Sequence, residues 1–241
     1  MKVSVVIPAF NEERLLPLTI QSVRQAAESF VKRGWDYEII VCDNNSTDGT
    51  SQIAAGLGVK VVFEPVNHIA KARNTGARSA CGDWLIFIDA DSQPSEDLFD
   101  DVADAILSGK VIAGGATVRL DNVPKSALIV NQFWNFISVT MKWMAGSFIF
   151  CRADVFRTIG GFNEELFVSE EIDLSKRIKK LAKSMKMKVV ILTSHPLITS
   201  GRKVYLYKKR EYFWFILKTL FLFGATIKDR ESCNIWYDGK R

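Results

Sequence analysis

Six short apolar runs, separated by stretches with helical patterning, constrain the fold of this chain more than any other feature. These runs, rich in β-branched residues, occur at 3–7, 37–42, 59–63, 84–88, 111–118 and 188–192. Continuous apolar runs of this length are typical of strands buried on both faces. Helices are expected between them, at about 12–33, 50–57, 69–80 and 95–107. Strands that alternate with helices predict an α/β fold with a mostly parallel sheet flanked by helices.

The size and composition of the chain suit one such domain with a short appendage. The chain has 241 residues, of which 48% are hydrophobic, so it can bury a sizeable core. We expect the domain at 1–203 and an aromatic-rich, basic helical segment at 204–241. The net charge of +5 indicates an anionic partner, such as a nucleotide, a nucleic acid or a membrane surface, without choosing among them.

The cysteines and the N-terminus bear on the compartment. The four cysteines stand far apart without a CxxC pair, so the sequence indicates neither a zinc site nor a disulfide framework. A strand pattern begins at residue 3, with no charged leader and apolar segment before it, so no signal peptide is expected. The cytoplasm is therefore the expected location.

Acidic and amide side chains follow the first four apolar runs. They occur in the stretches PAFNEE, DNNSTDGT, EPVNHIAKARNTG and DADSQP. Ligands of open parallel sheets bind beyond the carboxyl ends of the strands, so these stretches are expected to converge on one site. Turn formation alone would also explain any one of them.

Asp89 and Asp91 directly follow the apolar run WLIFI. Their carboxylates are expected on one side of an extended segment, because side chains two residues apart share a face. Such a pair suits a hard divalent cation that keeps several waters and also binds substrate phosphates. The alternative is that both aspartates only favour the positive N-terminus of the helix that follows.

Five linked stretches are more specific than any single motif. They are VSVVIPAFNEE, EIIVCDNNSTDGT, ARNTGARSACGDWLIFIDADSQP, GSFIFCRADVFRTIGGFNEE and SEEIDLSKRI, and they span residues 3 to about 180. In order and spacing they resemble the motifs of the family 2 glycosyltransferases, which have a GT-A fold. The resemblance implies an inverting enzyme that moves a sugar from a nucleotide-diphosphate sugar with the help of Mn²⁺ or Mg²⁺. It favours UDP as the nucleotide, and the acceptor would be a hydroxyl group or a lipid-linked molecule.

The resemblance also implies roles for individual residues. Those assigned to the donor and its pocket are Pro8, Ala9, Glu12, Asp43, Arg73, Asp89, Gly146 and Glu170. Asp43 is expected at the nucleotide base, while Asp89 and Asp91 are expected to hold the metal. Glu171 takes the position of the catalytic base, where the family pattern has an aspartate, and would accept the proton of the acceptor hydroxyl.

Two residues beyond the last apolar run are further candidates. His195 is expected either as a third metal ligand or phosphate contact, or as a structural residue. Arg202 is expected to close over the diphosphate, because a guanidinium group matches phosphate geometry.

The segment 119–144 and the C-terminus are the parts that the resemblance explains least. The first is expected to carry acceptor specificity and contains Asn131, Trp134, Asn135 and Trp143. The second sets basic residues before an apolar run at 212–227, which is too short to cross a bilayer. That run predicts a helix lying on an anionic membrane surface or, equally, one packed on the domain or on a homodimer partner. In the membrane case the enzyme would lie on the cytoplasmic face of the inner or plasma membrane.

Two other functions stay open on the sequence. A sugar-phosphate nucleotidyltransferase would share the scaffold and the aspartates, but it should carry a glycine-rich loop after the first strand, and PAFNEE has none. A catalytically silent nucleotide-sugar binding protein would need no base, so Glu171 argues against it. No nucleic acid partner is expected.

Overall fold

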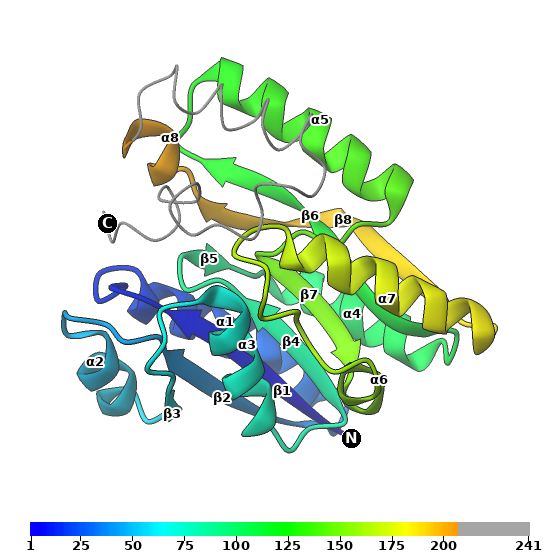
Figure 1. The fold of residues 1–241 in the computed structure, drawn as a ribbon, viewed down its shortest axis with the longest axis horizontal. Helices are drawn as coiled ribbons and strands as arrows, with labels where there is room; N and C mark the ends of the chain where they lie inside the picture. The colour runs from blue at the N-terminus through cyan, green and yellow to red at the C-terminus, as the bar shows by residue number, and fades with distance from the viewer. Residues whose placement is uncertain (207–241) are drawn as a thin grey trace.

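The computed structural model describes residues 1–206, which fold around one eight-stranded sheet (Figure 1). The strands are β1 Lys2–Ala9, β2 Asp36–Asp43, β3 Lys60–Phe63, β4 Trp84–Ile88, β5 Ser92–Gln93, β6 Val111–Asp121, β7 Phe148–Arg152 and β8 Lys188–Ser200. Their order in the sheet is β3-β2-β1-β4-β7-β6-β8-β5. Only β7 and β5 pair antiparallel to their neighbours, so the predicted mostly parallel sheet is confirmed.

Helices cover both faces of the sheet, as Figure 1 shows. They are α1 Leu16–Lys32, α2 Thr50–Gly56, α3 Ile69–Arg78, α4 Glu96–Leu107, α5 Lys125–Met141, α6 Ala153–Thr158, α7 Glu170–Ser184 and α8 Arg202–Leu206. On one face, Ile20 of α1 and Phe99 of α4 belong to the core; on the other, Phe156 of α6 and Ile178 of α7 do. Burial on both faces explains why the strands read as continuous apolar runs.

The antiparallel strand β7 lies between β4 and β6, and the sequence did not predict it. It requires a close approach to β6, where Gly114 faces Phe150. A Cβ at Gly114 would lie 2.4 Å from Phe150 Cζ on β7 and 2.6 Å from the Val190 carbonyl oxygen on β8, so a larger residue there would collide with both neighbouring strands. β7 also brings the preceding loop to the end of β4, where Asp89 N–H donates to the Ser147 carbonyl at 3.3 Å.

Several element boundaries differ from those predicted. The first helix begins at Leu16 rather than near residue 12, because the loop before it bonds to a second loop. In that contact, Asn11 N–H donates to Ser46 Oγ at 3.0 Å and Glu12 N–H to Thr50 Oγ1 at 2.8 Å. Strands β6 and β8 extend well beyond the predicted 111–118 and 188–192.

The predicted C-terminal helical segment lies outside the described residues, apart from α8. The domain boundary at 203 therefore stays a prediction, as does the membrane helix at 212–227. Within residues 1–206, no helix combines the length and the apolar character needed to cross a bilayer.

Candidate active site

A cavity of about 460 Å³ opens beyond the carboxyl ends of β1 and β4. Its polar end brings together nine residues that the sequence singled out: Pro8, Ala9, Glu12, Arg73, Asp89, Asp91, Gly146, Glu170 and Glu171. Its apolar wall comes mainly from α5 and the segments beside it, and includes Leu120, Val130, Trp134, Ile137, Phe167 and Val204. The strand ends therefore converge on one site, as expected for a sheet of this type.

Arg73 of α3 ties the end of β4 to the start of α7. Its side chain, 3% exposed, contacts Asp89 Oδ1 at 3.0 Å and Glu170 Oε1 at 2.5 Å. It also donates to the Gly146 carbonyl at 2.8 Å, and a Cβ at that glycine would lie only 3.3 Å from the guanidinium. Burial alone would lower the pKa of Arg73, but the carboxylates of Asp89 and Glu170 outweigh it and raise that pKa, so the group stays charged.

Arg202, at the start of α8, also connects two distant carboxylates, on the other side of the polar end. Its guanidinium contacts Glu12 and lies 3.2 Å from Asp91 Oδ2. The backbone beside it is fixed, since Gly201 N–H donates to Asp121 Oδ1 at 2.9 Å. In this structure Arg202 therefore meets carboxylates at the point where it was predicted to close over a diphosphate.

Asp89 and Asp91 have the chemistry that a hard divalent cation requires. Both line the cavity, with side chains 31% and 10% exposed, and each carboxylate accepts a contact from an arginine. Within residues 1–206, no cluster of three or more His, Cys, Asp or Glu side chains could share a metal ion. A cation here would complete its oxygen shell with water and phosphate, as Mg²⁺ commonly does.

The competing explanation for the two aspartates was the N-terminus of the following helix. That helix, α4, takes its cap from Ser95, whose Oγ accepts the Leu98 N–H at 3.1 Å. Asp89 and Asp91 instead meet Arg73 and Arg202 in the cavity wall.

Glu171 lies in the first turn of α7, in the cavity wall beside Glu170. Removal from bulk water raises the pKa of Glu171 to about 8, and the negative charge of Glu170 acts in the same direction. A group whose pKa lies near neutrality is well matched to accept a proton at neutral pH. The geometry and the pKa therefore both suit a general base.

The backbone just before α7 is strained at Ser169, two residues before Glu171. Ser169, 8% exposed, has a φ of 64° and no side-chain cap bond to α7. A left-handed conformation at a residue other than glycine costs about 1–3 kcal/mol and persists where the surrounding structure enforces it. Here Ser175 helps to fix the turn, since its hydroxyl donates to the Glu171 carbonyl at 2.7 Å and accepts the Met144 N–H at 3.0 Å.

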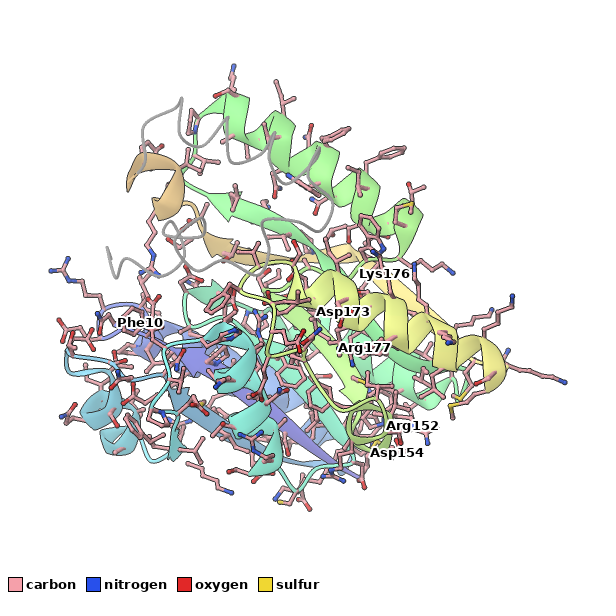
Figure 2. The ribbon with its side chains drawn as sticks, in the orientation of Figure 1. Phe10, Arg152, Asp154, Asp173, Lys176 and Arg177 are labelled. Atoms are coloured by element: carbon pink, nitrogen blue, oxygen red, sulfur yellow. The ribbon has the colours of Figure 1, made fainter. Side chains whose placement is uncertain are left out.

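Asp173 and Arg177 lie together on α7, as Figure 2 shows, and neither lines the cavity. Arg177 Nε contacts Asp173 Oδ2 at 2.7 Å, and its Nη1 donates to the Ile159 carbonyl at 2.7 Å. This pair fastens α7 to the turn after α6. Of the acidic residues in the first turn of α7, Glu170 and Glu171 are the two that line the cavity.

The structure does not bring His195 to the polar end. Its Nδ1 lies 3.0 Å from Asp101 Oδ2 on α4, and its side chain is 44% exposed. His195 precedes Thr199, which contacts Asp91, by four residues of β8, or about 13 Å of extended chain. The metal-ligand prediction for His195 therefore has no geometric support, and the structural alternative describes its surroundings.

Asp43 lies at the end of β2, next to the cavity but not in its wall. Its Oδ1 accepts the Ser46 N–H at 3.0 Å, and the residue is 5% exposed. Its neighbour Asn44 does line the cavity and accepts the His68 N–H at 2.9 Å. The role of Asp43 at a nucleotide base stays a prediction.

Sequence reasoning missed a ring contact that joins two walls of the site. His68 is 2% exposed, and its ring lies 4.5 Å from that of Phe167 in the loop before α7. No sequence motif signals this contact, because it joins residues 99 positions apart in the chain.

Helix α5 is held against β6 by two amide side chains. Asn135 accepts the Val118 N–H at 3.0 Å and donates to the Val118 carbonyl at 2.8 Å, and Asn131 donates to the same carbonyl at 2.7 Å. Val118 follows an irregularity in the pairing of β6 with β8, which leaves its backbone groups available to α5. Two of the residues expected to confer specificity therefore position the helix.

Comparison with known sequences finds relatives that are named as sugar transferases. AglE, a glycosyltransferase of Haloferax volcanii, is 27% identical over 208 residues, covering 80% of this chain and 66% of AglE. The undecaprenyl-phosphate 4-deoxy-4-formamido-L-arabinose transferase of Photorhabdus laumondii is 36% identical over 109 residues, covering 40% of this chain and 31% of that enzyme. The chain thus spans less than two thirds of the length of both relatives.

Comparison with solved structures supports the fold. S. aureus TarS residues 1–349, solved with UDP-GlcNAc, superpose with a TM-score of 0.63 at 20% identity, covering 99% of this chain and 71% of that one. The mannosyltransferase PcManGT of Pyrobaculum calidifontis, solved with GDP-Man and Mn²⁺, gives 0.65 at 19% identity, covering 84% and 59%. Both similarities confirm the expected GT-A fold.

The family assignment rests on the sequence itself. The profile of Glycosyl transferase family 2 matches residues 4–151, which is more than half of the chain and includes both aspartates, Arg73 and Gly146. The chain therefore belongs to glycosyl transferase family 2.

Proposed function

We propose that this enzyme transfers a sugar, with inversion, from a UDP-linked donor to a hydroxyl group of a lipid-linked acceptor. Mn²⁺ or Mg²⁺ would be held by Asp89 and Asp91. One observation carries the proposal: a single cavity contains these two carboxylates, the carboxyl of Glu171 with its raised pKa, and an extended apolar wall. The polar end would take the donor diphosphate, and the apolar wall would take the acceptor.

The comparisons support the donor half of the proposal. TarS was solved with UDP-GlcNAc, and PcManGT with GDP-Man and Mn²⁺. The choice of UDP rests on the resemblance around Asp43. The charge that develops on the leaving diphosphate is the charge that a divalent cation at Asp89 and Asp91 would neutralise.

The position of Glu171 supports the proposed chemistry at the acceptor. The bond from the anomeric carbon to the donor phosphate breaks as the acceptor oxygen attacks from the opposite face, which inverts the configuration. Glu171 accepts the hydroxyl proton during that attack. Arg73 and Glu170 hold the start of α7, and with it Glu171, at a fixed distance from Asp89.

The charges of the cavity favour a hydroxyl over a phosphate as the attacking group. Two arginines stand at the polar end, and both already contact carboxylates: Arg73 contacts Asp89 and Glu170, and Arg202 contacts Glu12 and Asp91. The donor diphosphate would bring a divalent cation with it, whereas an acceptor phosphate without a cation would meet mainly carboxylates, which would repel it. The apolar wall supports a lipid carrier, and the relative from Photorhabdus laumondii is named for undecaprenyl phosphate.

A nucleotide-release assay tests the donor side first. Unmodified enzyme would be incubated with a panel of UDP- and GDP-sugars, with Mn²⁺, Mg²⁺ or EDTA. We expect slow, metal-dependent release of UDP from one UDP-sugar. Release that EDTA does not reduce, or a preference for GDP-sugars, would contradict the proposed donor or metal.

A paired acceptor assay tests the other side. Dodecyl β-glucoside offers hydroxyl groups on an apolar tail, and farnesyl phosphate offers a phosphate on one. We expect radiolabelled sugar to be transferred to the glucoside and not to the phosphate. Preferential transfer to farnesyl phosphate would overturn the hydroxyl assignment.

A further inference from the structure

Helix α5 carries an apolar stripe on the side that faces away from the cavity. Ile129, Phe133, Phe136 and Val139 are 67%, 51%, 67% and 39% exposed, and their spacing places them along one face. The stripe is about 15 Å long at the helical rise per residue. A surface helix of a water-soluble domain normally turns a polar face to solvent, so this face is expected to meet an apolar environment.

Helix α5 carries positive but no negative charge on its own residues. Helix α5 contains no acidic residue from Lys125 to Met141, and lysines lie at both ends. Lys179 Nζ donates to the Met141 carbonyl at 2.8 Å, and Lys142 and Lys176 are close enough to lower the pKa of Lys179, after burial, which is the larger cause. A lysine cluster therefore borders the C-terminal end of the stripe.

The positive charge at the N-terminal end of the stripe is not explained by helix stability. Cations stabilise the C-terminus of a helix, so the cluster at Met141 has that second explanation. Lys125 stands in the first turn of α5, where the helix dipole disfavours a positive charge. Basic residues at both ends of an apolar face fit an anionic surface that is broader than the helix itself.

The stripe also lies on the helix that forms a wall of the cavity. Ala127, Val130, Trp134 and Ile137 of the same helix line the cavity, so α5 separates it from the exposed face. Figure 2 labels Lys176 where α7 meets the C-terminal end of α5, and its Nζ lies 5.8 Å from the ring centre of Trp143, another cavity residue. At the opposite end, the Tyr205 hydroxyl of α8 donates to the Asn122 carbonyl at 2.7 Å, just before α5 begins.

We propose that the outer face of α5 docks on an anionic lipid bilayer, with Ile129, Phe133, Phe136 and Val139 entering the boundary between headgroups and acyl chains. The lysines at both ends of the helix would contact the negatively charged headgroups. This surface is distinct from the C-terminal run at 212–227. The proposal rests on the proposed function only in that docking would bring a lipid-linked acceptor to the cavity. The C-terminal segment is itself basic, so charge does not favour it as the cover of a face bordered by lysines.

Sedimentation with lipid vesicles tests this surface in the full chain. Vesicles of phosphatidylcholine and phosphatidylglycerol would be compared with vesicles of phosphatidylcholine alone, at low and high salt. The test variant is Phe133→Ser with Phe136→Ser. The matched control is Phe63→Ser at the end of β3 with Leu107→Ser at the end of α4, two residues of similar exposure, 57% and 60%. We expect the α5 variant to bind anionic vesicles at least about tenfold more weakly than the unmodified protein, and the control to bind equally well.

Three results would overturn the proposal. They are no binding of the unmodified protein to anionic vesicles at low salt, equal binding by the α5 variant, and equal loss in the control. A fall in the melting temperature of the α5 variant by more than about 5 °C would show that another part of the chain covers the face. A dimer that becomes a monomer in the variant would identify a second copy as the occupant.

The same samples separate this proposal from the proposed function. Release of UDP from a soluble donor needs no membrane, so the α5 variant should retain it in full. Loss of vesicle binding with unchanged UDP release supports the docking surface. Absence of UDP release from every donor would contradict the proposed function and leave the vesicle result standing.

Discussion

The polar end and the apolar wall of the cavity are held in place in opposite ways. The polar end depends on ion pairs between distant parts of the chain: Arg73 with Glu170, which is buried, and Arg202 with Glu12, which is partly buried. The partners are 97 and 190 residues apart. The apolar wall depends mainly on one helix, which Asn131 and Asn135 attach to β6. We therefore expect changes in the apolar wall to leave the polar end undisturbed, as a fixed donor site with a variable acceptor site would require.

The largest expected effect separates chemistry from binding at the polar end. Glu171→Gln removes the proposed base but keeps the shape of the side chain, so transfer should fall by about 10²–10⁴-fold. Binding of UDP with Mn²⁺, measured by calorimetry, should stay within about twofold of the unmodified enzyme, because the side chain is not expected to touch the diphosphate. Glu28→Gln, an exposed change on α1, is the control. Turnover of Glu171→Gln within a few-fold of the unmodified enzyme would move the base role to Glu170.

The second prediction concerns the cost of breaking the polar end. Arg73→Gln leaves Asp89 and Glu170 without their buried cation, so the free energy of unfolding should fall by about 3–5 kcal/mol. Arg33→Gln breaks a more exposed pair with Asp100 and should cost about 1 kcal/mol or less. Urea denaturation measures both values. Equal costs for the two variants would mean that the polar end is no more rigid than the surface.

The pH dependence of transfer provides the third prediction. Burial raises the pKa of Glu171 to about 8, so the base is mostly protonated below that pH and becomes active as pH rises. The value of kcat/KM should therefore rise about tenfold per unit between pH 6 and 7.5, and level off above about pH 8. Glu171→Gln should lose this dependence. A flat profile in the unmodified enzyme would show that Glu171 does not titrate in the productive step.

The smallest effect is expected at the attachment of the apolar wall. Asn135→Ala leaves the Val118 N–H without its partner, so the free energy of unfolding should fall by about 1–3 kcal/mol. UDP affinity should not change, because Val118 and α5 lie outside the polar end. Gln132→Ala, an exposed change on the same helix, should cost about 0.5 kcal/mol or less. A loss of UDP affinity in Asn135→Ala would show that the two parts of the cavity are coupled.

The sequence predicted the polar end well for a chemical reason. Asp89, Asp91, Arg73 and Glu171 each stand in a contiguous motif, and their oxygen and guanidinium groups are of the kind that a diphosphate and a cation would need. The sequence could not show which carboxylates the arginines contact. Arg202 meets Glu12 and Asp91 across 190 and 111 residues, and no local pattern records such pairing.

The apolar wall was predicted poorly, also for physical reasons. Helix α5 is apolar towards the cavity and towards solvent, so it lacks the one-sided periodicity that identifies a surface helix. The short run of β7 gives no signal of its direction or of its place between β4 and β6. The sequence predicted a strand that ends at residue 192, with His195 just beyond it, whereas β8 continues to Ser200 and sets His195 beside Asp101.

One pair of calorimetric titrations tests most directly whether UDP binds at the polar end of the cavity and not at the apolar wall. UDP would be titrated with Mn²⁺ into Asp91→Asn, at the polar end, and into Trp134→Ala, in the apolar wall. We predict that Asp91→Asn weakens UDP binding at least about tenfold, because it removes a charged oxygen from the proposed metal site, while Trp134→Ala stays within about twofold. Equal weakening by the two substitutions, or unchanged binding in Asp91→Asn, would contradict the account.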